Sequence, residues 1–359
     1  MSPAAGGLPS ISVVIPVRDG AADMPRLLKA LEKTRHPDCR ILVVDDASSD
    51  GTAEACAGFP RAKVLRLDRG RGPARARNVG AAAARSELVL FLDSDVELPE
   101  ASDIPLESAR RFQEDPALDA LCGPSAAQPL VPGPAAYNAA LYHAYYMESI
   151  FQGQAAVAGR ILFFATRCGA VRRSSFLRSG GFYESLRTVM NEDGEFGTRV
   201  WHMGWRTRFD RALGHAHRYP VRFTKLARSY FLTARVQACV DARWENSEDP
   251  SISWAEKGRR LLAAALLFLS AGLFLHPGPA VLAAFLVLSA ILLLSFGRLG
   301  ALALSEVPAG LLPSCFLVYV AVTPFILAGY LLGRVQAACG RSYLRGRPSD
   351  LPELQGWAG

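Results

Sequence analysis

Asp93 and Asp95 stand one residue apart and directly follow an apolar run, Leu88–Leu92. A continuous apolar run is typical of a strand that is buried on both faces of a parallel sheet. Ligands of open α/β sheets bind at the carboxyl ends of the strands, so both carboxylates are expected at such an edge. Close carboxylates repel each other unless a cation lies between them, and Mg²⁺ or Mn²⁺ is the cation that keeps a substrate phosphate as a further ligand. The competing interpretation is a pair of acidic turn residues that cap the next helix.

A second group of charged side chains follows other predicted elements. Asp45 and Asp46 end another apolar run, and Arg77 lies in a helix that begins near Pro73, after a loop rich in glycine and arginine. Glycines that lead into a helix N-terminus make an anion site, so Arg77 is assigned to a phosphate or a nucleotide. For the arginines of the loop itself, Arg69 and Arg71, a solvated basic surface is the preferred interpretation.

Another acid and two histidines come later in the chain. Asp193 lies in the first turn of a helix that is expected to open at Asn191, where the helix dipole favours acids for purely structural reasons. After a turn, Asp193 can also project into the cleft that holds Asp93. His215 and His217 follow two residues apart, and for both a structural role competes with metal binding.

The elements that must position these side chains alternate between strands and helices. Apolar runs predict strands, and helical spacing between them predicts helices. This order is typical of an α/β fold with a doubly wound, mostly parallel sheet. The expected strands occupy 11–17, 40–46, 63–68 and 87–93.

The distribution of charge divides the 359 residues, which carry a net charge of +7, into two kinds of sequence. Residues 10–250 carry charges throughout and are expected to form the sheet domain, after a tail at 1–9. Residues 251–338 are expected to form a membrane domain with apolar segments at 261–275, 280–296 and 311–333. Residues 339–359 are expected to be a C-terminal tail. A nucleotide substrate and an anionic membrane explain the basic balance, because the chain has no nucleic-acid-binding motif.

The N-terminus has no basic region followed by an apolar core, so it is not a signal peptide and the sheet domain is expected in the cytoplasm. The protein is thus expected to be a multi-pass protein of the cell (inner) membrane. The seven cysteines are scattered without a Cys-x-x-Cys pair, which indicates reduced thiols.

The number of membrane spans stays open. Three spans put the C-terminus opposite the sheet domain, whereas an even number agrees with a cytoplasmic basic tail that contains Arg334, Arg341, Arg345 and Arg347.

Six motifs stand in one order along residues 10–245, and together they resemble the family 2 glycosyltransferases, which have the GT-A fold. The resemblance implies a hexosyltransferase-type enzyme that uses a nucleotide sugar and Mg²⁺ or Mn²⁺. The motifs are Val13-Val-Ile-Pro-Val17, Val44-Asp-Asp-Ala-Ser-Ser-Asp-Gly-Thr52, Ala76-Arg-Asn-Val-Gly80, Phe91-Leu-Asp-Ser-Asp95, Gly180-Gly-Phe-Tyr-Glu184 and Glu192-Asp193.

The resemblance also implies roles for single residues on the nucleotide side. Asp45 matches the carboxylate that reads the base, with Pro16 and Arg18 nearby, and Arg77 matches the arginine that faces the nucleotide or its phosphates. The expected nucleotide contacts are Pro16, Arg18, Asp45, Asp46, Arg77 and Asp93.

On the metal side, Asp93 matches a residue near the ribose and the metal, and Asp95 matches a residue on the metal. Asp193 matches the catalytic base. His215 or His217 lies where some relatives place another metal ligand. The expected metal ligands are Asp93, Asp95 and His215, with His217 as the open alternative.

The expected reaction is an inverting transfer of a single sugar, with a UDP-sugar as the expected donor. The acceptor is expected to be a hydroxyl or phosphate of a membrane-associated molecule, either lipid-linked or part of a cell-envelope glycan. Polymer-forming relatives carry Gln-x-x-Arg-Trp after the Glu-Asp motif, whereas here Gln237 stands further from Arg243-Trp244, which disfavours processive synthesis. Two alternatives stay open: a non-catalytic nucleotide-sugar-binding membrane protein, and a nucleotidyltransferase with a similar sheet.

Overall fold

The computed structural model describes residues 7–154, 164–186, 191–244, 254–275, 278–340, 344 and 347–354. The chain divides into two compact units. Unit 1 contains Met1–Pro124, Gln154–His217 and Ser342–Gly359, and unit 2 contains Ser125–Gly153 and Arg218–Arg341.

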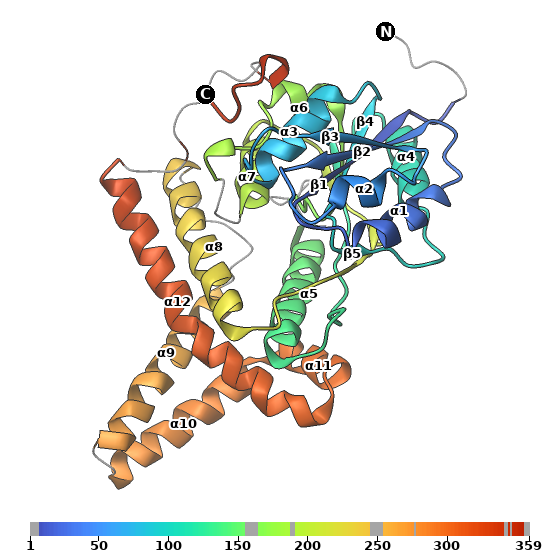
Figure 1. Ribbon diagram of the computed structural model, residues 1–359. Coiled ribbons are helices and arrows are strands. Elements are labelled where there is room, and N and C mark those ends of the chain that lie inside the picture. Colours follow the sequence, from blue (N-terminus) through green and yellow to red (C-terminus); the bar gives the residue numbers. More distant parts are fainter. Residues whose placement is uncertain are drawn as a thin grey trace. The chain divides into compact units, whose positions relative to one another are not determined.

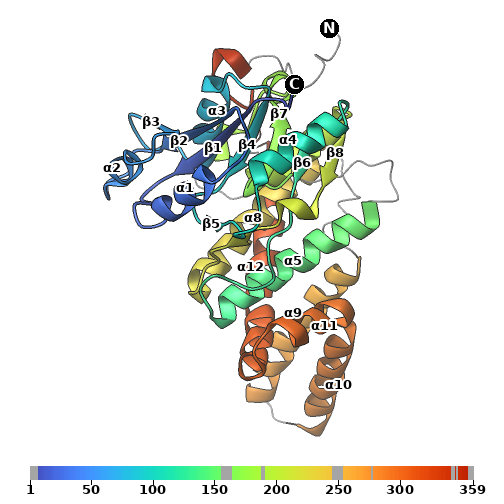
Figure 2. The same cartoon turned by 90° about the vertical axis from the view of Figure 1, so that its right-hand side faces the viewer.

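Unit 1 is built on a seven-stranded sheet with the order β3-β2-β1-β4-β7-β6-β8. Figure 2 shows β3, β2, β1 and β4 side by side in this order. Every pair in the sheet is parallel except those of β7, so the expected mostly parallel α/β fold is confirmed. The strands are β1 (Ile11–Val17), β2 (Cys39–Asp45), β3 (Ala62–Arg66), β4 (Leu88–Leu92), β6 (Ala120–Cys122), β7 (Cys168–Arg172) and β8 (Thr207–Phe209).

The reversed strand β7 changes which residues reach the edge where β4 ends. Because β7 is antiparallel to β4, it begins where β4 stops, and Leu92 pairs with Cys168. The amide of Asp93 donates a hydrogen bond to the carbonyl of Arg167, at 3.2 Å. The residue before β7 therefore lies beside the first of the two spaced carboxylates.

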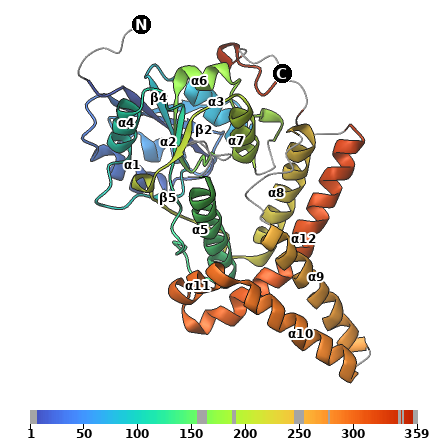
Figure 3. The same cartoon turned by 180° about the vertical axis from the view of Figure 1, so that it is seen from behind.

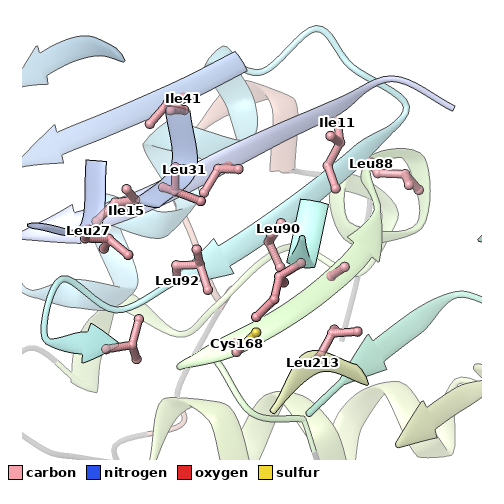
Figure 4. Close-up of a cluster of buried hydrophobic side chains, with 14 of the residues drawn as sticks. Ile11, Ile15, Leu27, Leu31, Ile41, Leu88, Leu90, Leu92, Cys168 and Leu213 are labelled. Atoms are coloured by element: carbon pink, nitrogen blue, oxygen red, sulfur yellow. The ribbon is translucent and has the colours of Figure 1, made fainter. Parts of the chain in front are cut away.

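Helices cover both faces of the sheet (Figure 1). One face carries α1 (Met24–Glu32) and α4 (Ile104–Glu114), whose apolar side chains join those of alternate β1 and β4 residues in one buried cluster (Figure 4). The other face carries α3 (Pro73–Ala83), α6 (Arg173–Arg178) and α7 (Glu192–His202). Alternation along buried strands thus supplies both faces with apolar side chains.

A ring of aromatic side chains anchors α7 on the second face. Phe91 of β4 packs against Phe164, Phe176 and Phe182, with ring centroids 6.4, 5.2 and 5.3 Å away. Phe196 of α7 packs on Phe182 at 4.7 Å. The burial of these rings fixes the helix whose first turn carries Asp193.

Unit 2 is helical in its described residues. The longest helices, α8 and α12, pack closely because Gly329 and Gly333 of α12 face the backbone carbonyls of Phe231 and Arg235 of α8. α9 and α10 pack against each other (Figure 3). The helices are α5 (Pro134–Gln154), α8 (Phe223–Trp244), α9 (Trp254–Leu275), α10 (Pro279–Ser295), α11 (Gly297–Glu306) and α12 (Leu312–Ala338).

Two segments of unit 2, Gly258–Leu275 and Ala309–Ala338, are long and apolar enough to cross a membrane. A bent pair, Pro279–Ser295 and Leu299–Glu306, raises the number to three if it forms one span, although its parts meet at 80°. Phe268, Phe274 and Leu294 are 83%, 89% and 83% exposed, which suits contact with lipid rather than water.

The compact units differ from the expected domain boundaries in two places. Helices α5 and α8 fall within the expected sheet domain at 10–250, but they pack in unit 2 with the apolar helices. The segment expected as a tail at 339–359 belongs largely to unit 1, from Ser342 onward. Both differences arise from packing between segments that are distant in sequence, which local patterns do not report.

Candidate active site

A two-stranded ribbon brings the spaced carboxylates together with a histidine. Asp93 and Asp95 flank the turn after β4, and β5 (Val96–Glu97) follows at once. β5 pairs with β9 (Ala216–His217), and the register sets Val96 opposite His217. Backbone pairing between distant segments therefore places the imidazole of His217 beside Asp95, with Nε2 3.1 Å from Oδ1.

Asp93, Asp95 and His217 form a group with the chemistry of a metal site. One ligand atom from each lies within 4.8 Å of the others, and the residues are buried or partly buried. Two carboxylate oxygens and one imidazole nitrogen make a mixed oxygen and nitrogen donor set that Mn²⁺ or Mg²⁺ can accept. The structure thus groups His217 with the two carboxylates, whereas the sequence-based expectation named His215 and kept His217 as the open alternative.

His215 lies close by but faces a different partner. Its Nδ1 is 3.2 Å from the carbonyl oxygen of Leu213, and the residue is 3% exposed. Burial lowers the pKa of His215 to about 4, so the ring is neutral at physiological pH. Its position supports the turn that leads into β9.

The buried side chain of Arg77 links two carboxylates of the site. Its Nη2 donates to Oδ1 of Asp93 at 2.6 Å, and its Nη1 donates to Oε1 of Glu192 at 2.5 Å. Burial favours the neutral form of Arg77, but the two carboxylates outweigh burial and raise its pKa. Burial acts to raise the pKa of Asp93. The charge of Arg77, and after it that of His217, opposes burial and holds the pKa of Asp93 below its ordinary value. Arg77 therefore stays charged and keeps Asp93 ionised.

Asp193 lies next to this bridge, in the first turn of α7. Burial, followed by the charge of Glu192, raises the pKa of Asp193 to about 6. The cations Arg167 and Arg77 oppose this shift, and the same two cations act on Asp93. These shared neighbours show that Asp93 and Asp193, a hundred positions apart in sequence, lie in one electrostatic environment.

Asp45 ends β2 and Asp46 follows it on the same edge, but the two carboxylates have different surroundings. Asp45 is fully buried, and its Oδ1 accepts a hydrogen bond from the amide of Ser48 at 2.8 Å. Its Oδ2 accepts no hydrogen bond within the described residues and faces Nη1 of Arg66 at 3.5 Å. One buried acceptor of Asp45 therefore lacks a hydrogen-bond donor within the described residues and has the charge of Arg66 beside it.

Both carboxylate oxygens of Asp46 are already occupied by the backbone. They accept hydrogen bonds from the amides of Arg71 and Gly72, at 2.6 and 2.8 Å. Gly72 has φ 88° and ψ 167°, a conformation that residues with a Cβ rarely adopt. Asp46 thus shapes the loop that starts α3, and through it the position of Arg77.

Pro16 and Arg18 are the other two residues expected at the nucleotide. Pro16 lies within β1, paired with Val44, where its ring is buried. The side chain of Arg18 is 59% exposed and lies against Gly70.

Two residues of the site, Arg167 and Glu192, received no role from the sequence. Glu192 belongs to the Glu-Asp motif, yet only its ion pair with Arg77 indicates what it does. Arg167 acts on Asp93, Asp193 and His215. The reversal of β7 brings it there, and a pattern of apolar residues does not reveal the direction of a strand.

The motifs and the fold agree with comparisons to known proteins. Residues 12–179 match the family described as Glycosyl transferase family 2. A succinoglycan biosynthesis protein of Rhizobium meliloti is 35% identical over 95 residues, which cover 26% of this chain and 27% of the relative. A pre-mycofactocin glycosyltransferase of Mycobacterium tuberculosis is 31% identical over 229 residues, which cover 59% of this chain and 44% of the relative. The chain thus spans less than half the length of either relative.

The solved structure of a mannosyltransferase from Pyrobaculum calidifontis, in complex with GDP-Man and Mn²⁺, shares the fold. The TM-score is 0.58 at 19% identity, over 93% of this chain and 88% of that chain. At this level of identity the likeness establishes the GT-A fold alone. The family match, the ordered motifs and the mixed sheet agree with one another: residues 12–179 are similar to glycosyl transferase family 2, within a sheet of the GT-A type.

Proposed function

We propose that this protein transfers a single sugar from a nucleoside-diphosphate sugar to a membrane-associated acceptor, with inversion at the anomeric carbon. The observation that carries the proposal is the convergence of two kinds of group. Asp93, Asp95 and His217 form a set of metal donors, and Asp193 is a carboxyl with its pKa raised to about 6. Such a site can bind a diphosphate and accept a proton near neutral pH.

Asp93, Asp95 and His217 would hold Mn²⁺ or Mg²⁺, and the imidazole ligand favours Mn²⁺. When bound, the cation supplies positive charge to the donor diphosphate. Arg77 holds Oδ1 of Asp93 through its own Nη2, so the orientation of this ligand is set before the donor arrives.

Asp193 is the proposed catalytic base. Its ionised carboxylate accepts the proton of the acceptor hydroxyl while the oxygen attacks the anomeric carbon. The bond to the nucleoside diphosphate breaks as the new bond forms, on the opposite face of the sugar. A single displacement of this kind inverts the anomeric configuration.

Asp45 is the proposed contact for the base of the donor. Its buried Oδ2, which accepts no hydrogen bond within the described residues, can accept one from a ring N–H. Uracil and guanine both offer a ring N–H in neutral form. UDP-sugars are therefore the first donors to test and GDP-mannose the second, since the Pyrobaculum mannosyltransferase was solved with GDP-Man.

The acceptor is proposed to be lipid-linked or a glycan held at a membrane. The support is the pair of segments apolar enough to span a bilayer, together with the similarity to a Rhizobium meliloti protein of succinoglycan biosynthesis. Confinement of enzyme and acceptor to one surface raises the effective acceptor concentration without any added contact.

The tail after the last apolar helix supports a membrane topology with an even number of crossings. Residues 1–124 and the segment from Ser342 onward belong to the same compact unit. Both therefore lie on one side of the membrane, which we propose is the cytoplasmic side because of the basic residues that follow α12. Gly258–Leu275 and Ala309–Ala338 then cross, and the bent pair between them does not.

The test is a transfer assay on membranes that contain the full chain. Labelled UDP- and GDP-sugars are supplied with Mn²⁺, Mg²⁺ or a chelator, and the products are extracted into organic solvent or retained on a glycan fraction. The proposal expects label in one fraction, metal dependence, and release of a nucleoside diphosphate. Release of pyrophosphate would indicate a nucleotidyltransferase, and binding of a donor without any product would indicate a non-catalytic protein.

A further inference from the structure

The segment that follows the last apolar helix folds back onto the sheet unit. Its described part, residues 347–354, ends in a short turn of helix at Pro352–Leu354. The carbonyl of Pro348 accepts a hydrogen bond from the amide of Glu184 at 2.9 Å. The hydroxyl of Ser349 donates to Oε1 of Glu184 at 2.5 Å. We call residues 348–354 the C-terminal strap.

Leu354 is the apolar anchor of the strap. It is 2% exposed and belongs to the buried cluster that contains Phe91, Phe182 and Phe196. A side chain at Gly181, which has φ 72°, would collide with Leu354 and with Asn78. The absence of a side chain at Gly181 thus makes room for the strap as well as for helix α3.

Glu184, which contacts the strap, also accepts hydrogen bonds from two residues of helix α3. Its Oε2 accepts from Nη1 of Arg75 at 2.9 Å, and its Oε1 accepts from Nδ2 of Asn78 at 3.0 Å. Arg75 also forms an ion pair with Asp350 of the strap. Asn78 in turn exchanges hydrogen bonds with the backbone of Phe182, at 2.9 Å in both directions.

The strap is therefore linked to two residues of α3 on either side of Arg77: to Arg75 directly, and to Asn78 through Glu184. The guanidinium of Arg77 itself binds Asp93 and Glu192. The Gly180–Glu184 turn is also fastened to α7, because buried Arg199 donates to the carbonyl of Gly181 at 2.5 Å and to Glu195. Strap, turn, α3 and α7 form one connected set of contacts around the candidate site.

We propose that the C-terminal strap is a positioning element of the active site, which sets the placement of Arg77 through Glu184 and Asn78. This inference rests on the proposed function for its activity readout. The strap is covalently continuous with α12, so the chain that carries the membrane helix also completes the site. A donor is then bound productively only by a chain whose C-terminal segment has returned to unit 1.

The test uses the full-length chain with Leu354→Ala, and with Glu353→Ala as the matched control, since Glu353 is exposed in the same turn. Small displacements at a catalytic group lower rates by up to about 100-fold, so Leu354→Ala is expected to lower kcat/KM by about 10- to 100-fold. The loss should appear largely as a higher donor KM, with the acceptor KM unchanged. Glu353→Ala should match the wild type. Asp350→Ala should change kcat/KM less than about threefold, because an ion pair with an exposed partner contributes little.

A second measurement does not need a known donor. Hydrogen exchange at the amide of Glu184, which donates to Pro348, should become faster in Leu354→Ala, together with exchange at the start of α3.

Two results would overturn the proposal. One is a donor KM and an exchange rate of the Glu184 amide in Leu354→Ala that both match the wild type. The other is an activity that falls only in proportion to the folded fraction, with an unchanged donor KM. If the wild type transfers no sugar, the proposed function fails, and the exchange experiment still decides whether the strap is a positioning element.

Discussion

At the scale of single residues, the properties of the site depend on which of its buried carboxylates form an ion pair. Arg77 binds Asp93 and Glu192 at once, which only a planar guanidinium with several donors does well. Asp193 gains no such ion pair among its described contacts and lies beside the charge of Glu192. Its surroundings therefore push the pKa of Asp193 upward and the pKa of Asp93 downward. Two carboxylates with opposed shifts suit two different roles, one as a base and one as a ligand.

The raised pKa of Asp193 predicts the acid side of the pH profile. A base works only when it is ionised, so log kcat/KM, which reports the groups of the free enzyme, should fall with a slope of one below about pH 6 and be level above it. Glu192→Gln removes a charge that raises this pKa, so the fall should move to lower pH. The measurement is kcat/KM for the donor from pH 4.5 to 8.5 at one fixed metal concentration. A level profile across this range would contradict the assignment.

The choice of His217 over His215 predicts a difference between two alanine variants. His217→Ala removes one donor of the Asp93–Asp95–His217 group, so the Mn²⁺ concentration for half-maximal activity should rise about 10- to 100-fold. His215→Ala is the matched control, since its ring faces the carbonyl of Leu213, and should leave that concentration unchanged. A metal titration of both variants decides the point. The reverse pattern would restore His215 as the ligand.

At the scale of elements, the sequence predicts strand ends well and contacts between distant segments poorly. The apolar runs before Asp45 and Asp93 indicated β2 and β4, because burial on both faces leaves a direct pattern. Two residues of β5 and two of β9 are too few for a pattern, so the pairing that selects His217 was not foreseen. The reversal of β7 and the strap also depend on tertiary packing alone.

The loop between β3 and α3 requires a backbone conformation at Gly72 that favours glycine. Gly72→Ala places a side chain at φ 88°, which costs about 1–3 kcal/mol, and should lower the melting temperature by about 2–12 °C. Gly58→Ala is the matched control, because a side chain there meets nothing within 4 Å. Thermal unfolding of both variants tests this, and the donor KM should rise only for Gly72→Ala. Equal melting temperatures would show that the loop tolerates a side chain.

At the scale of the whole molecule, the two compact units interleave along the chain. The chain leaves unit 1 at Ser125, returns near Gln154, leaves again at Arg218 and returns at Ser342. The apolar helices are therefore not a terminal anchor, since the sequence after them is part of the catalytic unit. This arrangement links the integrity of the site to the segment that contains the apolar helices.

This arrangement predicts that both ends of the chain face the same side of the membrane. Epitope tags before Met1 and after Gly359 should be cleaved by an added protease in the same vesicle orientation, and protected in the opposite one. The C-terminal tag leaves Leu354 in place, so the strap is retained. Tags that respond in opposite orientations would show an odd number of crossings and would exclude the return of the tail to unit 1.

The central claim is that Asp193 acts as a base beside a separate site for the donor, and the Asp193→Asn variant tests it most directly. Transfer rate and donor affinity are measured on the same preparation, with Mn²⁺ present. Asn cannot accept the proton, so the rate should fall by at least about 100-fold, since general base catalysis contributes on this order. Donor affinity should stay within about threefold of the wild type, and stability above pH 6 should not fall, because the variant removes a buried charge. A variant that keeps its rate, or loses donor affinity in parallel with its rate, would contradict the claim.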